Sequence, residues 1–88
     1  MTYTIKILEK AERELAAVPA KDRKRIALHI DELVDNPYPS GAQQLKGAFK
    51  NHFRIRIGDY RIIYQIENKV LTIVIVRIGH RREVYRKL

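Results

Sequence analysis

The sequence predicts one α+β domain, in which a helical hairpin packs on a mainly antiparallel sheet of four or five strands. Two observations predict this class. Residues 1–35 hold one alternating stretch followed by apolar residues at helical spacing, whereas from Gln43 onward the apolar period changes to two. Because 88 residues suffice for one core only, we expect a single domain over residues 1–88. The predicted order is β-α-α-β-β-β-β, followed by a short basic C-terminal segment.

The N-terminal half carries the first strand and both helices. The stretch YTIKIL, residues 3–8, alternates apolar and polar residues, which favours a strand. Two helical repeats follow, one over residues 8–18 and one from residue 20 to about 35. DNPYPSG, residues 35–41, ends the second helix because its prolines and glycine cannot continue the helical hydrogen bonds.

The C-terminal half reads as consecutive strands. FRIRI alternates strictly, Gly58-Asp59 is a two-residue hairpin signal, and Asn68-Lys69 is a weaker one. QLKGAF is a plausible short edge strand, and VLTIVIVRI is apolar on both faces, as an interior strand would be. The predicted strands are the edge strand at 44–49 and three longer ones at about 53–57, 60–67 and 70–78.

The charge of the chain is concentrated in its second half. Residues 1–44 hold seven basic and seven acidic residues, whereas residues 45–88 hold eleven basic and three acidic ones, which accounts for the whole net charge of +8. Such asymmetry favours a polyanionic partner, most often nucleic acid. The absence of cysteine fits a reducing cytoplasm, where we expect the protein. The longest apolar run, VLTIVIV, is far below the roughly 20 residues that span a bilayer, so no membrane partner is expected.

Hairpin register predicts a cluster of arginines. If Gly58 and Asp59 form the turn, Arg56 lies directly opposite Arg61, and Arg54 lies two residues along the same face. Like charges placed opposite each other destabilise a sheet, so a bound anion would explain the arrangement, and arginine suits bidentate phosphate contact. A solvated strand face with arginines splayed into water is the alternative.

The C-terminal segment RIGHRREVYRKL is expected to complete this cluster. Gly79 allows the chain to turn, so that Arg81, Arg82, Tyr85 and Arg86 fold over the end of the sheet. Tyr85 can stack on a base or take a proton, although it can equally be a buried anchor. His80 is a reserve acid or base, although a solvated histidine is the more ordinary interpretation. His29 and His52 receive no chemical role, and no spacing of residues predicts a metal site.

RNA phosphodiester cleavage suits such residues, because RNA brings its own nucleophile, the 2′-OH. Arginines supply electrostatic stabilisation of the transition state, usually the largest contribution, and no metal or other cofactor is required. Arginine remains protonated and cannot be the base. Tyr85, whose pKa neighbouring cations would lower, is the candidate to take the proton.

The sequence resembles the RelE/ParE toxin superfamily of bacterial and archaeal toxin–antitoxin systems, in its RelE-like branch. QLKGAFKNHFRIRIGDYRIIYQI and VRIGHRREVY carry the resemblance, which covers nearly the whole chain. It implies a type II toxin that cleaves messenger RNA in the ribosomal A site, leaving a 2′,3′-cyclic phosphate, and that a cognate RelB-like antitoxin neutralises. The ribosome with its message and the antitoxin are therefore the expected partners.

The resemblance also assigns residues. Arg54 and Arg56 match the basic pair on the first hairpin strand, which is lysine in the best-known pattern of the family. Arg61 matches the phosphate-binding arginine after the turn. Either Arg81 or Arg82 matches the arginine beyond the glycine, and Tyr85 matches the terminal tyrosine. His80 resembles a histidine of another subgroup. Contacts with RNA or the ribosome are expected from five further residues: Lys46, Lys50, Arg82, Arg86 and Lys87.

Two other functions remain open at this point. A ParE-like chain would inhibit DNA gyrase without cutting RNA, and a non-catalytic RNA-binding module would bind with a steep salt dependence but would not be toxic. The basic cluster with Tyr85 favours RNA cleavage. The apolar side chains of Ile63, Val74 and Val76 are expected on an exposed side of the sheet, where the antitoxin would cover them.

Overall fold

The computed structural model describes residues 2–47 and 51–84, and its architecture confirms the predicted α+β class. The strands lie in the order β1-β5-β4-β3-β2; β1 pairs with β5 in parallel and the other pairs are antiparallel. Along the described chain the elements are β1 (Thr4–Ile7), α1 (Glu9–Ala16), α2 (Ala20–Leu33), β2 (Gln43–Gln44), β3 (His52–Ile57), β4 (Tyr60–Glu67), the short 3-10 helix η2 (Asn68–Val70) and β5 (Thr72–His80).

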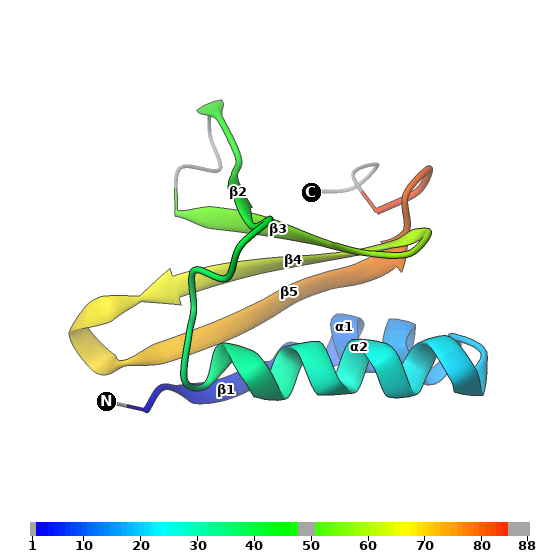
Figure 1. The fold of residues 1–88 in the computed structure, drawn as a ribbon, viewed down its shortest axis with the longest axis horizontal. Coiled ribbons are helices and arrows are strands. Elements are labelled where there is room, and N and C mark those ends of the chain that lie inside the picture. The colour runs from blue at the N-terminus through cyan, green and yellow to red at the C-terminus, as the bar shows by residue number, and fades with distance from the viewer. Residues whose placement is uncertain (1, 48–50, 85–88) are drawn as a thin grey trace.

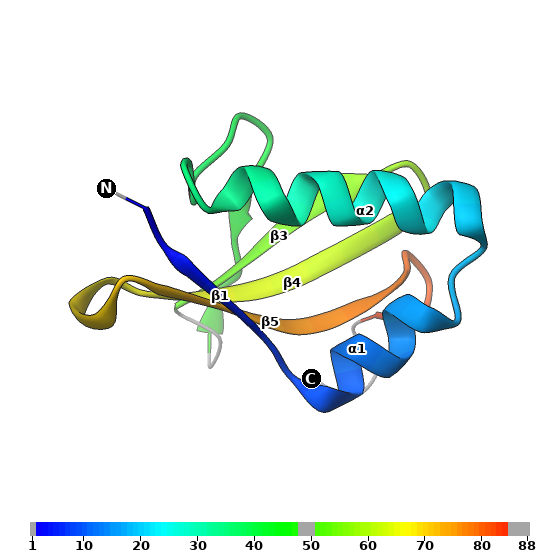
Figure 2. The same ribbon diagram turned by 90° about the horizontal axis from the view of Figure 1, so that it is seen from below.

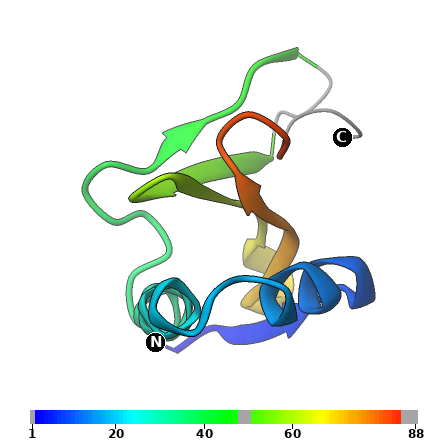
Figure 3. The ribbon, with the colours of Figure 1, turned by 90° about the vertical axis from the view of Figure 1, so that its right-hand side faces the viewer.

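The molecule has two layers. Both helices lie on the same side of the sheet, with α1 against β5 (Figure 1). The turn that follows β5, drawn in red, rises on the side of the sheet away from the helices (Figure 3). The helices therefore leave the other face of β3 and β4 to the predicted arginines.

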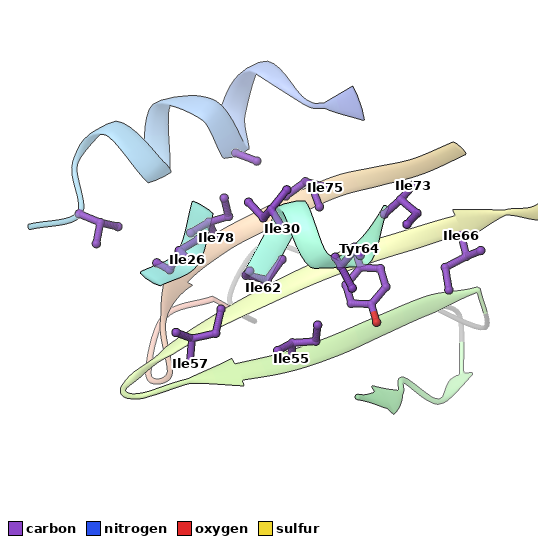
Figure 4. Close-up of a cluster of buried hydrophobic side chains, with 13 residues drawn as sticks. Ile26, Ile30, Ile55, Ile57, Ile62, Tyr64, Ile66, Ile73, Ile75 and Ile78 are labelled. Atoms are coloured by element: carbon purple, nitrogen blue, oxygen red, sulfur yellow. The ribbon is translucent and has the colours of Figure 1, made fainter. Parts of the chain in front are cut away.

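Alternation along the strands builds the core between these layers. Ile55 and Ile57 of β3 and Ile62 of β4 point towards the helices, where they meet Ile26 and Ile30 of α2 (Figure 4). The remaining buried members of this cluster are Ala11, Val18, Leu33, Tyr64, Ile66, Ile73, Ile75 and Ile78. Isoleucine dominates because β-branched side chains pack well on a pleated surface.

Tyr64 is the polar exception in this core. Its ring stacks on Phe53 at 5.8 Å, and its hydroxyl donates a hydrogen bond to the Pro37 carbonyl at 2.9 Å. Burial, with a smaller contribution from Tyr38, raises the pKa of Tyr64 above its ordinary value of 10.0. The hydroxyl therefore remains protonated in the folded state and anchors the loop that follows α2.

Removal of the Tyr64 hydroxyl tests this anchor. Tyr64→Phe should lower the free energy of unfolding at pH 7 by about 1 kcal/mol, the usual net value of a buried hydrogen bond. Because the folded pKa is raised, the unfolded chain loses this proton first, and the wild type should lose stability as the pH rises above 10. Urea titrations at pH 7 and pH 11 should therefore show a smaller difference between the two proteins at pH 11. A difference that is unchanged or larger there would contradict the assignment.

Three details differ from the sequence-based expectations. The second hairpin uses η2 and then Leu71, whose φ is +46°, so β5 begins at Thr72 and not at residue 70. The described part of the edge strand is Gln43–Gln44, and Gly47, with φ of +76°, departs from extended backbone. Residues 48 and 49 of the expected strand lie outside the described residues. Ile63 is fully buried without any partner protein. In the strand register it lies between Arg54 and Arg77, and the aliphatic parts of these two side chains can cover it. The expected exposure of Ile63 is therefore wrong, whereas Val74 and Val76 are half-buried.

Within the described residues, no helix combines the length and the apolar character that crossing a membrane requires.

Candidate functional site

The first hairpin brings the predicted arginines together. Arg56 lies directly opposite Arg61, and Ile57 lies opposite Tyr60, which confirms the predicted register. Gly58 has a φ of +59° whereas Asp59 has a negative φ, as a type II′ turn requires. Arg56 is exposed and Arg61 is half-buried. Two guanidinium groups are thus neighbours at one end of the sheet, on the face opposite the helices.

Hydrogen bonds within the protein hold the guanidinium groups of Arg61 and Arg54. Arg61 Nη1 donates to the carbonyl oxygens of Gly58 at 3.1 Å and Tyr60 at 2.9 Å, so this side chain is tied to the turn. Arg54 Nη2 donates to Gln43 Oε1 on the neighbouring strand β2. Both arginines are therefore positioned by the protein before any ligand arrives, which is the condition for effective electrostatic stabilisation.

The end of β5 brings a third arginine to the same place. Gly79 lies opposite Arg61 on the neighbouring strand. Two residues later, the Arg81 backbone N–H donates to the Asp59 carbonyl at 2.8 Å, and Arg81 Nε lies 4.0 Å from Asp59 Oδ1. The turn after β5 and the turn between β3 and β4 meet at one end of the molecule (Figure 1). Arg81 therefore belongs to the cluster that Arg56 and Arg61 begin.

Val84 fixes the path of the chain beyond Arg81. Its side chain is fully buried, and a Cβ added to Gly79 would lie 3.5 Å from Val84 Cβ. This distance is an ordinary van der Waals contact, so Val84 packs directly over Gly79. As far as Val84, the C-terminal turn thus folds back onto β5, whereas the predicted placement of Tyr85 and Arg86 lies outside the described residues.

His80 packs against the first hairpin. Its ring makes an edge contact with Tyr60 at 5.9 Å, and its Nδ1 accepts the Arg82 backbone N–H at 3.3 Å. With Nδ1 as an acceptor, the neutral ring carries its proton on Nε2. His80 Nε2–H can therefore donate a hydrogen bond. The Arg82 side chain is exposed.

The remaining predicted residues are not part of the described cluster. Lys46 is exposed and follows Leu45, whose N–H bonds to the His52 carbonyl at 2.8 Å. Leu45 thus lies four strand residues, or about 13 Å, from Arg56 along β3, and Lys46 lies one residue further away. Lys50, Tyr85, Arg86 and Lys87 lie outside the described residues.

Two partners of the cluster were missed by sequence reasoning. Asp59, which the sequence marks only as a turn residue, accepts a hydrogen bond from the Arg81 amide through its backbone carbonyl, and the Gln43 side chain accepts one from Arg54.

A cavity of about 430 Å³ lies beside the cluster, between α2 and the β2–β3 edge, and is lined by His29, Glu32 and Arg56 among others. His29 Nδ1 lies 2.8 Å from the Arg25 carbonyl, which leaves Nε2 as the acceptor in the neutral ring. No local motif around His29 indicates this placement.

This arrangement suits the binding of an extended anion. Its charges are unbalanced, because five basic residues, Arg54, Arg56, Arg61, Arg81 and Arg82, lie near three acidic ones, Asp59, Glu83 and Glu32. Among the described residues, no three His, Asp or Glu side chains are placed to hold a metal ion. The described residues therefore concentrate positive charge here, and the imidazole rings of His80 and His29 lie beside them.

Comparison with known proteins identifies relatives over almost the whole chain. The family model described as the ParE toxin of the type II toxin–antitoxin system parDE matches residues 5–85. Toxin RelG of Mycobacterium tuberculosis is 30% identical over 88 residues, covering 99% of this chain and 100% of that protein. Toxin RelE3 of Methanocaldococcus jannaschii is 35% identical over 77 residues, covering 83% of this chain and 84% of that protein.

A solved structure has the same architecture. The toxin–antitoxin complex RelBE2 from Mycobacterium tuberculosis contains a chain that superposes with a TM-score of 0.82 at 27% identity. The match covers 92% of the present chain and 100% of that chain. The fold and the sequence thus both point to toxins of toxin–antitoxin systems.

Proposed function

The chain belongs to the RelE/ParE superfamily of toxins from type II toxin–antitoxin systems, and from this premise we propose that it is a ribosome-dependent endoribonuclease that cleaves messenger RNA in the A site. The observation that carries this proposal is the meeting of Arg56, Arg61 and Arg81 at one end of the sheet. A gyrase inhibitor has no need of guanidinium groups gathered on one backbone phosphate, whereas a nuclease does. The names of the relatives, RelG and RelE3, point in the same direction.

In the proposed reaction, the 2′-OH of one nucleotide attacks its own 3′ phosphate. A bond forms between the 2′ oxygen and phosphorus, and the bond from phosphorus to the 5′ oxygen of the next nucleotide breaks. The products are a 2′,3′-cyclic phosphate and a 5′-hydroxyl. Arg61 and Arg81 bind the phosphate oxygens, and Arg56 adds charge stabilisation as negative charge builds up in the transition state.

Proton transfer needs groups other than arginine. We propose Tyr85, which the sequence places directly after Val84, as the group that accepts the 2′-OH proton. His80 is the candidate to protonate the leaving 5′ oxygen from Nε2. It does so as the imidazolium, which carries a proton on both ring nitrogens and therefore gives up the Nδ1 contact with the Arg82 amide. Lys46, Lys50, Arg54, Arg82, Arg86 and Lys87 are proposed to bind the RNA backbone or the ribosome.

A RelB-like antitoxin is the second proposed partner. The solved relative in the RelBE2 structure is a toxin bound to its antitoxin. The basic half of this chain would attract acidic residues of such a partner. Because the partner binds only the folded toxin, it also stabilises this small domain by mass action. Cytoplasmic ribosomes and a cytoplasmic antitoxin fit the absence of cysteine.

One observation favours a second candidate function, inhibition of DNA gyrase. The matching family model is described as the ParE toxin of parDE systems, and it spans residues 5–85. The fold alone does not separate the two activities, because function resides in the site and not in the scaffold.

Induced expression in a bacterial host separates these functions. Primer extension on messages from induced cells should show new 5′ ends within translated codons, and these ends should disappear when translation is blocked. The purified protein should leave gyrase supercoiling unchanged. Growth arrest with intact messages and inhibited supercoiling would reject the nuclease and support the ParE-like function.

A further inference from the structure

The outer edge of β5 lacks a strand partner where the candidate site begins. β1 pairs with β5 only from Thr4 opposite Thr72 to Ile7 opposite Ile75. Within the described residues, the part of β5 beyond Ile75 has no strand on that side, and α1 runs alongside it instead (Figure 2). A backbone N–H on such an edge needs another acceptor.

Glu14 of α1 supplies that acceptor. Its Oε1 accepts the Ile78 backbone N–H at 3.1 Å. The same carboxylate accepts Arg77 Nε at 3.2 Å and 3.0 Å, and its Oε2 lies 2.9 Å from Arg77 Nη2. We call this arrangement of Glu14, Arg77 and the Ile78 amide the Glu14 clamp. One side chain from α1 thus holds two consecutive residues of β5.

The clamp follows an irregularity in the strand. Tyr64 lies opposite Ile75, yet Ile63 lies opposite Arg77, so Val76 is an extra residue in β5. Such a bulge bends a strand and redirects the side chains that follow. The direction of β5 after Val76 is therefore not fixed by regular pairing with β4 alone. The clamp acts on the two residues that come next.

Stability alone does not account for the clamp. Arg77 is only 8% exposed, and its Nη1 is buried without a hydrogen-bond partner among the described residues. A buried ion pair is often no more stabilising than apolar residues of similar size, and a donor without an acceptor is a cost. What the clamp provides and an apolar pair would not is a directional hold on the backbone.

We propose that Glu14 is a positioning residue for the C-terminal half of the candidate site, an inference that rests on the proposed nuclease function. The residue after Ile78 is Gly79, which lies opposite Arg61, and Arg81 bonds to the Asp59 carbonyl. Loss of the hold on Ile78 lets this end of β5 shift relative to the hairpin. Arg81 then moves away from the phosphate position shared with Arg61. A displacement of about 1 Å can lower a reaction rate about 100-fold.

The test compares two matched pairs of substitutions, each of which removes one ion pair made by a glutamate of α1. Glu14→Leu with Arg77→Met replaces the clamp by apolar side chains and leaves no unpaired charge, so the fold should be retained. Glu9→Leu with Arg13→Met makes the same chemical change in an exposed ion pair of α1, whose side chains are 84% and 75% exposed. Glu14→Asp is a milder variant that keeps the charge but withdraws the carboxylate by one methylene group.

The cleavage rate and the amide hydrogen exchange of Arg81 test the positioning role of Glu14. In single-turnover cleavage on programmed ribosomes, the double substitution Glu14→Leu, Arg77→Met should lower the rate about 10- to 100-fold, while the ribosome concentration for half-maximal rate changes less than about threefold. Glu14→Asp should lower the rate about tenfold by the same displacement. Amide hydrogen exchange of Arg81 should accelerate at least about tenfold in both, with core amides such as Ile62 unchanged. The exposed control pair should match the wild type in both measurements.

Each result decides the inference. A folded Glu14→Leu, Arg77→Met protein that cleaves at the wild-type rate, with Arg81 still protected, would overturn it. If that protein does not fold, Glu14→Asp decides by the same criteria. A wild type that cleaves no message while Arg81 exchange responds to the clamp would reject the proposed nuclease and retain the positioning role. The two failures are thereby distinguished.

Discussion

Replacing Arg61 by alanine should lower the single-turnover rate of message cleavage by about 100- to 1,000-fold while the protein remains folded. This magnitude is the usual cost of removing one positioned group that stabilises transition-state charge. Arg61 is half-buried, lies between Arg56 and Gly79 in the sheet, and is tied to the Gly58 and Tyr60 carbonyls. Its guanidinium is therefore held in place before RNA binds, and its charge acts without reorganisation.

The control for Arg61→Ala is Arg13→Ala on α1. Arg13 is 75% exposed and pairs only with Glu9 of the same helix in the described contacts, so the substitution removes one positive charge away from the site. Arg13→Ala should retain cleavage within about twofold, because surface ion pairs contribute little. Arg61→Lys should fall between the two, since lysine keeps the charge but loses the bidentate geometry. Equal toxicity and equal cleavage in wild type and Arg61→Ala would contradict the assignment of Arg61.

Ile62→Ala should have the largest effect on stability, lowering the free energy of unfolding by about 2–5 kcal/mol. Ile62 is completely buried, and the register places it opposite both Ile55 and Ile78 at the centre of the core (Figure 4). Truncation leaves a cavity that these neighbours fill only in part. For a domain of 88 residues, whose total stability is of order 10 kcal/mol at most, this is a large fraction.

Leu28→Ala provides the matched control for Ile62→Ala. Leu28 is 62% exposed on α2, so its truncation opens no cavity, and alanine is a good helix former. The unfolding free energy of this variant in urea should stay within about 0.5 kcal/mol of the wild type. If the two substitutions cost the same, the burial of Ile62 in this core is wrong.

The sequence predicts the order of elements because the apolar period changes cleanly from helical to alternating. The first hairpin is predicted down to individual pairs, since Gly58-Asp59 fixes the register that puts Arg56 opposite Arg61. The second hairpin is less well predicted, because η2 and the left-handed Leu71 lengthen a turn that Asn68-Lys69 suggests to be short. Local sequence carries no strong signal for a left-handed leucine.

The sequence predicts only those parts of the site that follow from strand and turn patterns. Register accounts for Arg56 and Arg61. Arg81 follows directly after β5, but the turn that the sequence assigns to Gly79 begins only after His80, since Gly79 is paired with Arg61 inside the strand. The Glu14 clamp joins residues 63 apart in the chain, and Glu14 reads in the sequence as one of several charged residues on a helix. Such contacts form because β1 stops pairing with β5 at Ile75. The residue pattern of the sequence does not predict that position. The catalytic roles of the cluster remain predictions.

The chemistry of the RNA ends tests the central claim most directly. Purified protein is incubated with programmed ribosomes, and the termini of the two fragments are identified by mass spectrometry. Arginine-stabilised attack by the 2′-OH predicts a 2′,3′-cyclic phosphate on the upstream fragment and a 5′-hydroxyl on the downstream one. A 3′-hydroxyl paired with a 5′-phosphate, or intact message at enzyme concentrations that stop growth, would contradict it.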